Sequence, residues 1–359
     1  MRTTHALLVA ALVAALSPLA VAQDTPELPQ VGTYRDTDIK LEGFANTLTF
    51  FAPVYETLVV EGDSEYLQMD FSDLRLPPGS KLELTSLADG DVQVATPDDV
   101  QAGTFRSAYF NGFAVRVRIW TPPGADAPTG RISRIDRGLA SYGEPDSICG
   151  SSDNRRFRNR RPICRLLIQK SGGTYVCTGW LVSSSTGGHV TAGHCLSGAS
   201  SVTAQYNCPR SSSSGAIRNP SSADQYSWRS STRRYSNRGV GNDWGVFRVN
   251  GNPYSRQSAY FTFANPNTSS NHRRNGYGSA SGSLNFAQKD HRGRLSSVSS
   301  TTIRYRIDST GGDSGGPVYR GTWRAVGIHT HGGCTRTGGS NAGTNRNLAA
   351  FQSALATVR

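Results

Sequence analysis

The six cysteines of this 359-residue chain all lie in its last 211 residues. They are Cys149, Cys164, Cys177, Cys195, Cys208 and Cys334. Short apolar runs and Ser- and Gly-rich turns surround them, and apolar residues at helical spacing occur only between residues 347 and 358. An even number of cysteines in an exported chain favours disulfides. The pattern therefore predicts an all-β domain over residues 147–359, closed by one C-terminal helix.

The first 22 residues have the features of a signal peptide. A lone Arg2 precedes an apolar stretch, Ala6 to Leu16, and small residues lead up to Ala22. This apolar core is shorter than the roughly 20 residues that span a bilayer. We expect cleavage after Ala22, a secreted product and no membrane anchor.

Residues 23–146 predict a second β-rich unit. Runs such as 55–60, 81–84 and 114–120 contain alternating or β-branched residues, and we also interpret 48–51 as a strand. Pro- and Gly-containing turns separate these runs. The spacing fits a small β-sandwich of about 100 residues. It can serve as a propeptide that is cut off within residues 140–147, or as a retained accessory domain.

The charge of the chain is divided unevenly. The net charge is +12, but residues 147–359 contain 25 Arg and 2 Lys against 6 Asp and no Glu, a balance of +21. The arginines are scattered among Ser, Gly and Asn, and do not form the basic clusters typical of nucleic-acid binding. We expect a solvated basic surface and no nucleic-acid partner. A metal site is not expected, because no Cys-x-x-Cys pair is present.

The segment from Gly311 to Val318, Gly-Gly-Asp-Ser-Gly-Gly-Pro-Val, is the strongest chemical signal. Glycines on both sides of Ser314 allow a tight turn that exposes one hydroxyl group. Such a turn can aim the amides of Gly312 and Ser314 at one point, as an oxyanion hole does. Ser314 is therefore the candidate nucleophile.

A serine nucleophile needs a base, and a histidine base needs a carboxylate that fixes its tautomer. His194 lies in Thr-Ala-Gly-His-Cys, and Asp243 begins an apolar run in Asn-Asp-Trp-Gly-Val. His189 lacks a comparable context, and we interpret Asp224 as a solvated loop residue. The predicted catalytic residues are His194, Asp243 and Ser314, in the chain order His, Asp, Ser.

Through these three motifs, residues 149–359 resemble the chymotrypsin-like serine proteases, and in particular secreted bacterial glutamyl and lysyl endopeptidases. The resemblance implies two six-stranded antiparallel β-barrels with the active site between them. It also implies disulfides Cys149–Cys334, Cys164–Cys208 and Cys177–Cys195, where cysteine number alone allows fifteen connectivities. We expect protein or peptide substrates, the propeptide as a further partner, no cofactor and a monomer.

Two pocket candidates predict opposite substrate specificities. Asp308 lies six residues before Ser314, where the resemblance to trypsins implies a preference for Arg or Lys. His329 lies where glutamyl endopeptidases place a histidine that receives the substrate carboxylate, and Ser309 would assist it. A domain of 213 residues would ordinarily hold roughly a dozen Glu, and this one holds none, which would spare a glutamyl enzyme from cutting itself. We therefore favour cleavage after Glu, with Asp308 in a structural role such as pairing with Arg306.

Two other functions are compatible with the same residues. A catalytically inactive homologue could use the basic surface to bind polyanions, although binding alone does not require all three catalytic groups. An esterase could use the same nucleophile, base and carboxylate. Reaction with an active-site probe separates the first alternative from an enzyme, and a comparison of ester with peptide substrates tests the second.

Overall fold

Two antiparallel sheets form the N-terminal part of the protein in the computed structural model, which describes residues 26–139 and 147–359. The first contains β1 (Gln30–Glu42), β9 (Thr129–Gly138), β3 (Tyr66–Arg75), β6 (Phe105–Arg106) and β7 (Phe110–Asn111); the second contains β2 (Ala52–Val60), β8 (Ala114–Thr121), β4 (Lys81–Ser86) and β5 (Val92–Ala95). Buried side chains alternate along β8 and pack against the other sheet, for example Val117 and Ile119 with Met69 and Ile135. The two sheets thus form a sandwich around one apolar core.

The strand predicted over residues 48–51 is wrong. Asn46 organises a turn there, because its side chain accepts a hydrogen bond from the Leu48 amide and donates one to the Phe50 carbonyl. Side-chain bonds of this kind compete with strand pairing. Phe50 is 60% exposed, and β2 begins only at Ala52.

The C-terminal part contains two closed barrels of six antiparallel strands each, so the predicted fold class is confirmed. The first barrel comprises β11 (Ile163–Lys170), β14 (Ser201–Gln205), β15 (Gln225–Asn237), β16 (Asp243–Val249), β13 (Gly188–Thr191) and β12 (Gly173–Leu181), and β11 closes on β12. The second comprises β19 (Lys289–Val298), β18 (Asn271–Gly276), β21 (Pro317–Arg320), β22 (Arg324–His331), β23 (Asn341–Asn345) and β20 (Thr302–Tyr305), and β19 closes on β20. Two short strands attach to the second barrel, β10 (Arg156–Phe157) and β17 (Thr262–Phe263).

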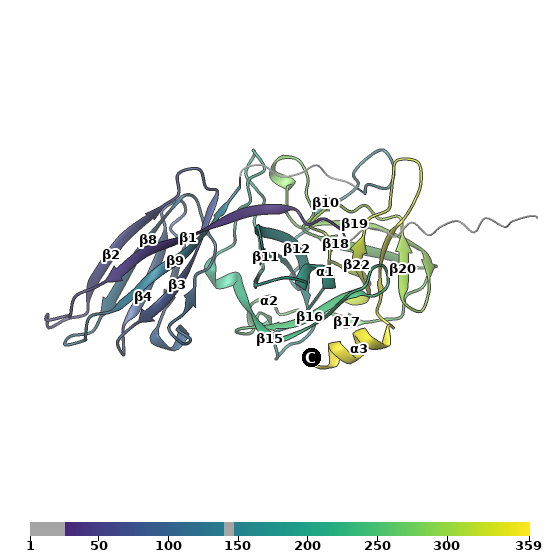
Figure 1. Cartoon of the computed structure of the whole chain (residues 1–359). Coiled ribbons are helices and arrows are strands. Elements are labelled where there is room, and N and C mark those ends of the chain that lie inside the picture. Colours follow the sequence, from purple (N-terminus) through teal and green to yellow (C-terminus); the bar gives the residue numbers. More distant parts are fainter. Residues whose placement is uncertain (1–25, 140–146) are drawn as a thin grey trace, which may run out of the picture.

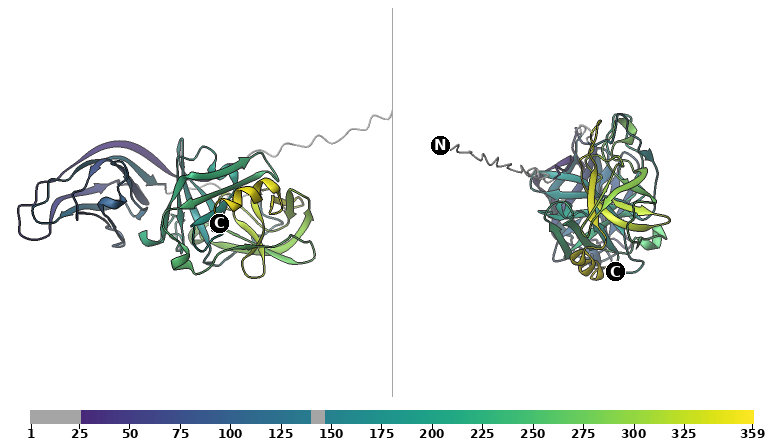
Figure 2. Two further views of the ribbon diagram at one scale, coloured as in Figure 1. Left: turned by 90° about the horizontal axis from the view of Figure 1, so that it is seen from below. Right: turned by 90° about the vertical axis from the view of Figure 1, so that its right-hand side faces the viewer.

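Strand β1 connects the sandwich to the first barrel. Its residues from Gly32 to Glu42 pair with β9, while Gln30 and Gly32 pair with Tyr175 and Thr174 of β12. Figure 1 shows this strand running from the sandwich across to the barrels. The sandwich lies at one end of the molecule and the barrels at the other (Figure 2). The residues before β1 therefore reach the barrel side of the molecule.

Helices are short. They are α1 (Gly193–Leu196), α2 (Tyr254–Gln257) and α3 (Ala349–Ala356), with 3-10 turns at Pro97–Asp99, Ser222–Asp224 and Gly282–Leu284. Helix α3 lies within the predicted C-terminal helical stretch and buries Phe351 and Leu355. These side chains join a core cluster with Trp244 of β16, which fixes the helix to the first barrel.

Two of the three expected disulfides are present, Cys149–Cys334 and Cys177–Cys195. The expected bridge Cys164–Cys208 is wrong. Both residues are free thiols, and both are buried. The Cys208 thiol donates to the Gln205 carbonyl instead. Burial raises the pKa values of both thiols, so they stay protonated and unreactive.

Two predictions concern residues outside the described ranges. The first is the signal peptide, residues 1–22. The second is the propeptide cleavage region, residues 140–147, of which only Ser147 is described. Within the described ranges, no helix is long and apolar enough to cross a membrane.

Candidate active site

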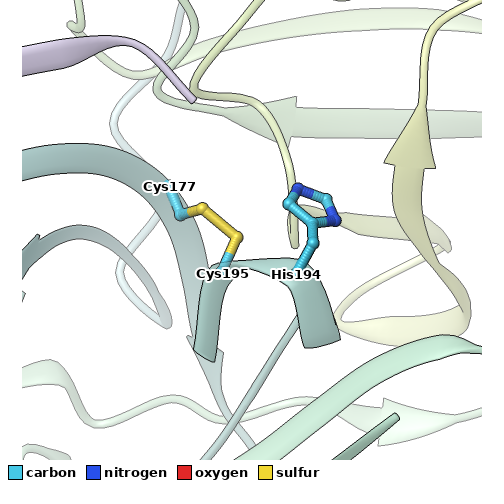
Figure 3. Close-up of side chains that lie close together, drawn as sticks. All are labelled: Cys177, His194 and Cys195. Atoms are coloured by element: carbon cyan, nitrogen blue, oxygen red, sulfur yellow. A yellow bond between two sulfur atoms is a disulfide. The ribbon is translucent and has the colours of Figure 1, made fainter. Parts of the chain in front are cut away.

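His194 lies on α1, directly after β13. The disulfide from Cys195 to Cys177 ties this helical turn to β12, and the imidazole ring lies beside it above the same turn (Figure 3). Position 193 requires glycine, since a Cβ atom there would lie 1.8 Å from the Ser236 carbonyl oxygen. The sequence before Cys195 thus brings the backbone close enough to β15 to position His194.

Asp243 is the first residue of β16 and is completely buried. Its Oδ1 accepts a hydrogen bond from the His194 amide at 3.0 Å, and its Oδ2 accepts one from His194 Nδ1 at 2.6 Å. The Thr344 hydroxyl in turn donates to the Asp243 carbonyl. Because Nδ1 carries the proton donated to the carboxylate, Nε2 is the basic nitrogen. The structure thus brings together the predicted base and its carboxylate.

Ser314 lies in the predicted glycine-rich turn, where Gly312 has φ +97° and Gly315 has φ +87°. Its carbonyl accepts a bond from the Thr178 amide at 2.8 Å, and the Gly315 carbonyl accepts one from the Trp180 indole. Among the described residues, the amides of Gly312 and Ser314 have no acceptor. Both donors predicted for the oxyanion hole are therefore free to bind a substrate carbonyl.

His194 and Ser314 are near one another but not hydrogen-bonded. Nε2 of His194 has no hydrogen-bond partner in the described part of the chain. The ring of His331 lies 6.3 Å from that of His194, and His331 lines the same cavity as Ser314. Hydrogen bonds between base and nucleophile are often long before substrate binds.

Asp313, next to Ser314, is held by a buried ion cluster. One carboxylate oxygen lies 3.0 Å from Arg155 Nη1, and the other 2.5 Å from Arg274 Nη1, with all three side chains inaccessible to solvent. Although burial alone would raise the pKa of Asp313, these guanidinium groups hold it well below its usual value. The sequence signalled neither arginine, because Arg155 resembles any other member of a short basic run.

A cavity of about 410 Å³ opens beside Ser314. It is lined by Pro26, Glu27, Ser147, Ser309–Gly311, Ser314 and His329–Cys334. Within it, His329 Nδ1 lies 2.7 Å from the Tyr305 hydroxyl, and Nε2 lies 2.5 Å from the Ser309 hydroxyl. Burial, reinforced by nearby Arg274, lowers the pKa of His329 to about 3, so this imidazole is neutral at physiological pH.

Asp308 is not among the residues that line this cavity. One of its carboxylate oxygens accepts a bond from the Cys149 amide at 2.9 Å, and the other accepts one from the Asn154 amide at 2.7 Å. The expected pairing with Arg306 is wrong, because Arg306 donates to the Gly339 carbonyl instead. The carboxylate therefore fixes the chain that follows the linker, residues 140–147, and its assignment to substrate binding has no support in this geometry.

Asp224 and His189, the alternatives to Asp243 and His194, both bind other groups. Asp224 is buried, contrary to the expectation of a solvated loop residue, because Arg256 pairs with it at 2.8 Å. His189 lies between the Gly187 carbonyl and the Tyr206 hydroxyl, and burial lowers its pKa to about 4. Neither residue contributes to the site around Ser314.

Cys177, His194 and Cys195 are the one close grouping of possible metal ligands in the described ranges. The two sulfur atoms are joined in a disulfide, whereas zinc and similar metals bind thiolates. This donor set therefore does not fit a metal ion.

Two closed barrels with a His–Asp pair and a glycine-flanked serine define the class of chymotrypsin-like folds. The sequence profile of the trypsin family matches residues 154–351, more than half of the chain. The protein therefore belongs to the trypsin family of serine endopeptidases.

Two curated proteins are similar to parts of the chain. "Secreted RxLR effector protein 73" of Plasmopara viticola is 35% identical over 74 residues, 18% of each protein. "Extracellular metalloprotease" of Bacillus subtilis (strain 168) is 28% identical over 214 residues, which are 53% of this chain and 64% of that protein. The chain thus spans less than two thirds of either relative.

Solved structures also show similarity. A thermostable serine protease, AL20, from an extremophilic microorganism is 16% identical with a TM-score of 0.45, covering 54% of this chain and 95% of that one. A Glu endopeptidase in complex with MPD is 19% identical with a TM-score of 0.45, covering 58% and 98%.

Proposed function

We propose that the protein hydrolyses internal peptide bonds through an acyl-enzyme on Ser314. The 2.6 Å contact between His194 Nδ1 and Asp243 carries this proposal, because it leaves Nε2 as a base directed by a buried carboxylate. Nε2 takes the Ser314 proton as Oγ attacks the substrate carbonyl, and then gives it to the leaving amine. The free amides of Gly312 and Ser314 stabilise the negative charge on the carbonyl oxygen.

A fluorophosphonate probe, which reacts with activated serines, tests this mechanism. We expect labelling of the protein freed of residues 23–146, and loss of labelling in Ser314→Ala. Absence of label on the wild-type protein would identify an inactive homologue, the polyanion-binding alternative. Rates on matched ester and peptide substrates then show whether esters are the preferred substrates.

The cavity beside Ser314 supports a preference for glutamate before the cut bond. His329 Nδ1 lies 2.7 Å from the Tyr305 hydroxyl and Nε2 lies 2.5 Å from the Ser309 hydroxyl; in the tautomer protonated at Nε2, His329 would donate to Ser309 and leave the Ser309 O–H free to donate. A substrate carboxylate would accept from these neutral groups by charge-assisted hydrogen bonds. Arg274 lies close enough to lower the pKa of His329 and adds a favourable positive potential. Asp308, which would attract Arg or Lys, is engaged elsewhere.

Digestion of a denatured protein of known sequence tests the specificity. Mapping the new C-termini by mass spectrometry should show that most cuts follow Glu. Cuts mainly after Arg or Lys would refute the acidic preference and support the alternative, a trypsin-like preference for basic residues.

We also propose that the protein is secreted after removal of residues 1–22, acts as a monomer and loses residues 23–146 on activation. The apolar start of the chain, the disulfides and the polar linker before Cys149 support this proposal. N-terminal sequencing of the active species from culture medium tests it. An active species that retains the sandwich would favour an accessory domain.

A further inference from the structure

The residues that precede β1 run along the candidate active site. The Pro29 carbonyl accepts a hydrogen bond from the Val176 amide of β12 at 3.0 Å, and Gln30 lies opposite Tyr175. Pro29 also packs against the turn that carries Ser314, since its Cγ lies 2.9 Å from where a Cβ of Gly311 would be. The segment is therefore joined to β12 at Pro29 and Gln30 beside the turn that carries the nucleophile, an attachment that resembles peptide binding by strand addition.

Glu27 and Leu28 line two different pockets, each of which also contains a candidate catalytic residue. Glu27 lines the cavity that also contains Ser314, Ser309 and His329. Leu28 lines a neighbouring pocket with His194 and packs against the cluster that contains the Cys177–Cys195 disulfide. The Glu27–Leu28 peptide bond thus connects a residue of the cavity that contains Ser314 to a residue of the pocket that contains His194.

We propose that the Glu27–Leu28 bond is a self-cleavage site of this enzyme. The proposal rests on the function proposed above and names one physiological substrate of the same site. Ser314 Oγ attacks the Glu27 carbonyl carbon, the C–N bond to Leu28 breaks, and His194 delivers the proton to the Leu28 amine. Water then hydrolyses the acyl-enzyme and releases the Glu27 carboxylate.

The position of this glutamate sets it apart from the others in the chain. Five more lie in the described ranges, Glu42, Glu56, Glu61, Glu65 and Glu83, and all belong to the sandwich. None of these five lines the cavity beside Ser314. Glu144 lies outside the described ranges, and Pro145 follows it. Glu27 is exposed at the cavity, so its side chain can turn inward without unfolding the sandwich.

Cleavage here would not release the sandwich. Leu28 to Gln30 would stay beside β12 through the Pro29–Val176 bond, and β1 would stay paired with β9. The new N-terminus therefore continues to occupy part of the cleft until the linker is also cut. Self-cleavage at Glu27 and removal of the sandwich are two separate steps.

Intact-mass measurement and N-terminal sequencing of the full secreted chain test the proposal. We expect the wild-type chain to begin at Leu28, and Ser314→Ala to retain Glu27. Glu27→Gln should slow the cut at least tenfold, while Glu42→Gln, an exposed change at the far end of β1, leaves its rate unchanged. For an intramolecular cut, the rate constant does not change on tenfold dilution.

The outcomes separate this proposal from the one on which it rests. If denatured proteins are cut after Glu but the wild-type chain never begins at Leu28, self-cleavage is wrong and the specificity stands. A Leu28 N-terminus in Ser314→Ala would show that another protease makes the cut and would also overturn the proposal. If denatured proteins are cut after Arg or Lys, the specificity itself fails.

Discussion

The rings of His194 and His329 both make hydrogen bonds, but the charges of their partners differ. His194 donates to the buried carboxylate of Asp243, which stabilises the positive charge that the ring acquires when it accepts a proton. His329 contacts two neutral hydroxyl groups, and burial keeps it uncharged. The first arrangement suits proton transfer, and the second suits binding of a substrate carboxylate.

Replacement of Ser309 by alanine tests the role of its hydroxyl group. The change removes one charge-assisted hydrogen bond to the substrate carboxylate, an interaction of about 1.5–3 kcal/mol. We expect kcat/KM for a Glu-containing peptide to fall roughly 10- to 100-fold. The matched peptide with Gln should lose much less, because its side chain is neutral.

Ser309→Thr serves as the control, since it restores a hydroxyl group at the same position. Its ratio of Glu to Gln cleavage should return toward that of the wild type. An equal loss of activity on both peptides in Ser309→Ala would indicate a structural role for Ser309 and not a role in specificity.

The two pocket candidates show what local sequence can predict about single residues. His194, Asp243 and Ser314 could be predicted from their motifs, because the residues next to them in the sequence help to position their side chains. Asp308 was ambiguous, because its role depends on residues 149–154, which pack behind it from a distant part of the chain. The sequence spacing between Asp308 and Ser314 does not determine the direction of the Asp308 side chain.

The turn that carries Ser314 depends on two separate elements of the fold. Arg274 comes from β18, and Arg155 comes from the segment just before β10, and both bind Asp313. The Arg274 guanidinium also donates to the Asp308 carbonyl. Both arginines already bind Asp313 in the uncut chain. Formation of this cluster therefore does not require that the linker is cut.

Arg274→Met should therefore destabilise the protein strongly. The change leaves a buried carboxylate with one partner fewer, and breaking a buried pair costs about 3–5 kcal/mol. Urea unfolding in the Ser314→Ala background, which prevents self-digestion, measures the free energy of unfolding. The loss should shrink as the pH falls below the usual pKa of an aspartate, because the unfolded chain then binds a proton at Asp313.

Arg273→Met is the matched control. Arg273 is the preceding residue on the same strand, it pairs with Asp290 at 2.9 Å, and its side chain is 36% exposed. A partly exposed pair contributes only about 0–1 kcal/mol. Equal destabilisation by both changes would contradict the special role of the buried cluster.

Strand prediction succeeded where burial alternates and failed where a side chain redirects the backbone. Residues 114–120 alternate and form β8, whereas Asn46 turns residues 48–51 into a loop. The pairing of β1 with β12 could not be predicted, because it joins residues about 140 positions apart. The cysteine pairs were implied by resemblance, and the thiols of Cys164 and Cys208 are free.

Opposite charges characterise the two parts of the whole molecule. Residues 23–146 contain 20 acidic and 10 basic side chains, whereas residues 147–359 carry a balance of +21. Opposite charges favour association of the sandwich with the barrels, and this attraction weakens as the salt concentration rises. Direct contacts reinforce it, since Asn111 of the sandwich binds the backbone of Asn219, and Asp91 binds Ser222.

Asp136 makes this association sensitive to pH. It belongs to β9 and is buried, and it accepts hydrogen bonds from Thr174 and Gln169 of the first barrel and from Tyr109 of the sandwich. Burial, with a smaller contribution from Asp70, raises its pKa from 3.8 to about 6 despite these bonds. The assembled state therefore favours the protonated acid, and association weakens as the pH rises from about 4 to above 6.

A protein nicked within the linker, in the Ser314→Ala background, allows the dissociation constant of the sandwich to be measured. A pKa shift of this size predicts that Kd rises roughly 25-fold between pH 4.5 and 7.5. Size-exclusion chromatography of serial dilutions at the two pH values measures this change. Asp136→Asn, which cannot ionise, should bind with nearly the same Kd at both, while Asp36→Asn, an exposed change on β1, should behave as wild type. If Asp136→Asn keeps the full pH dependence, other groups control release, and the buried carboxylate is not the pH-sensitive element.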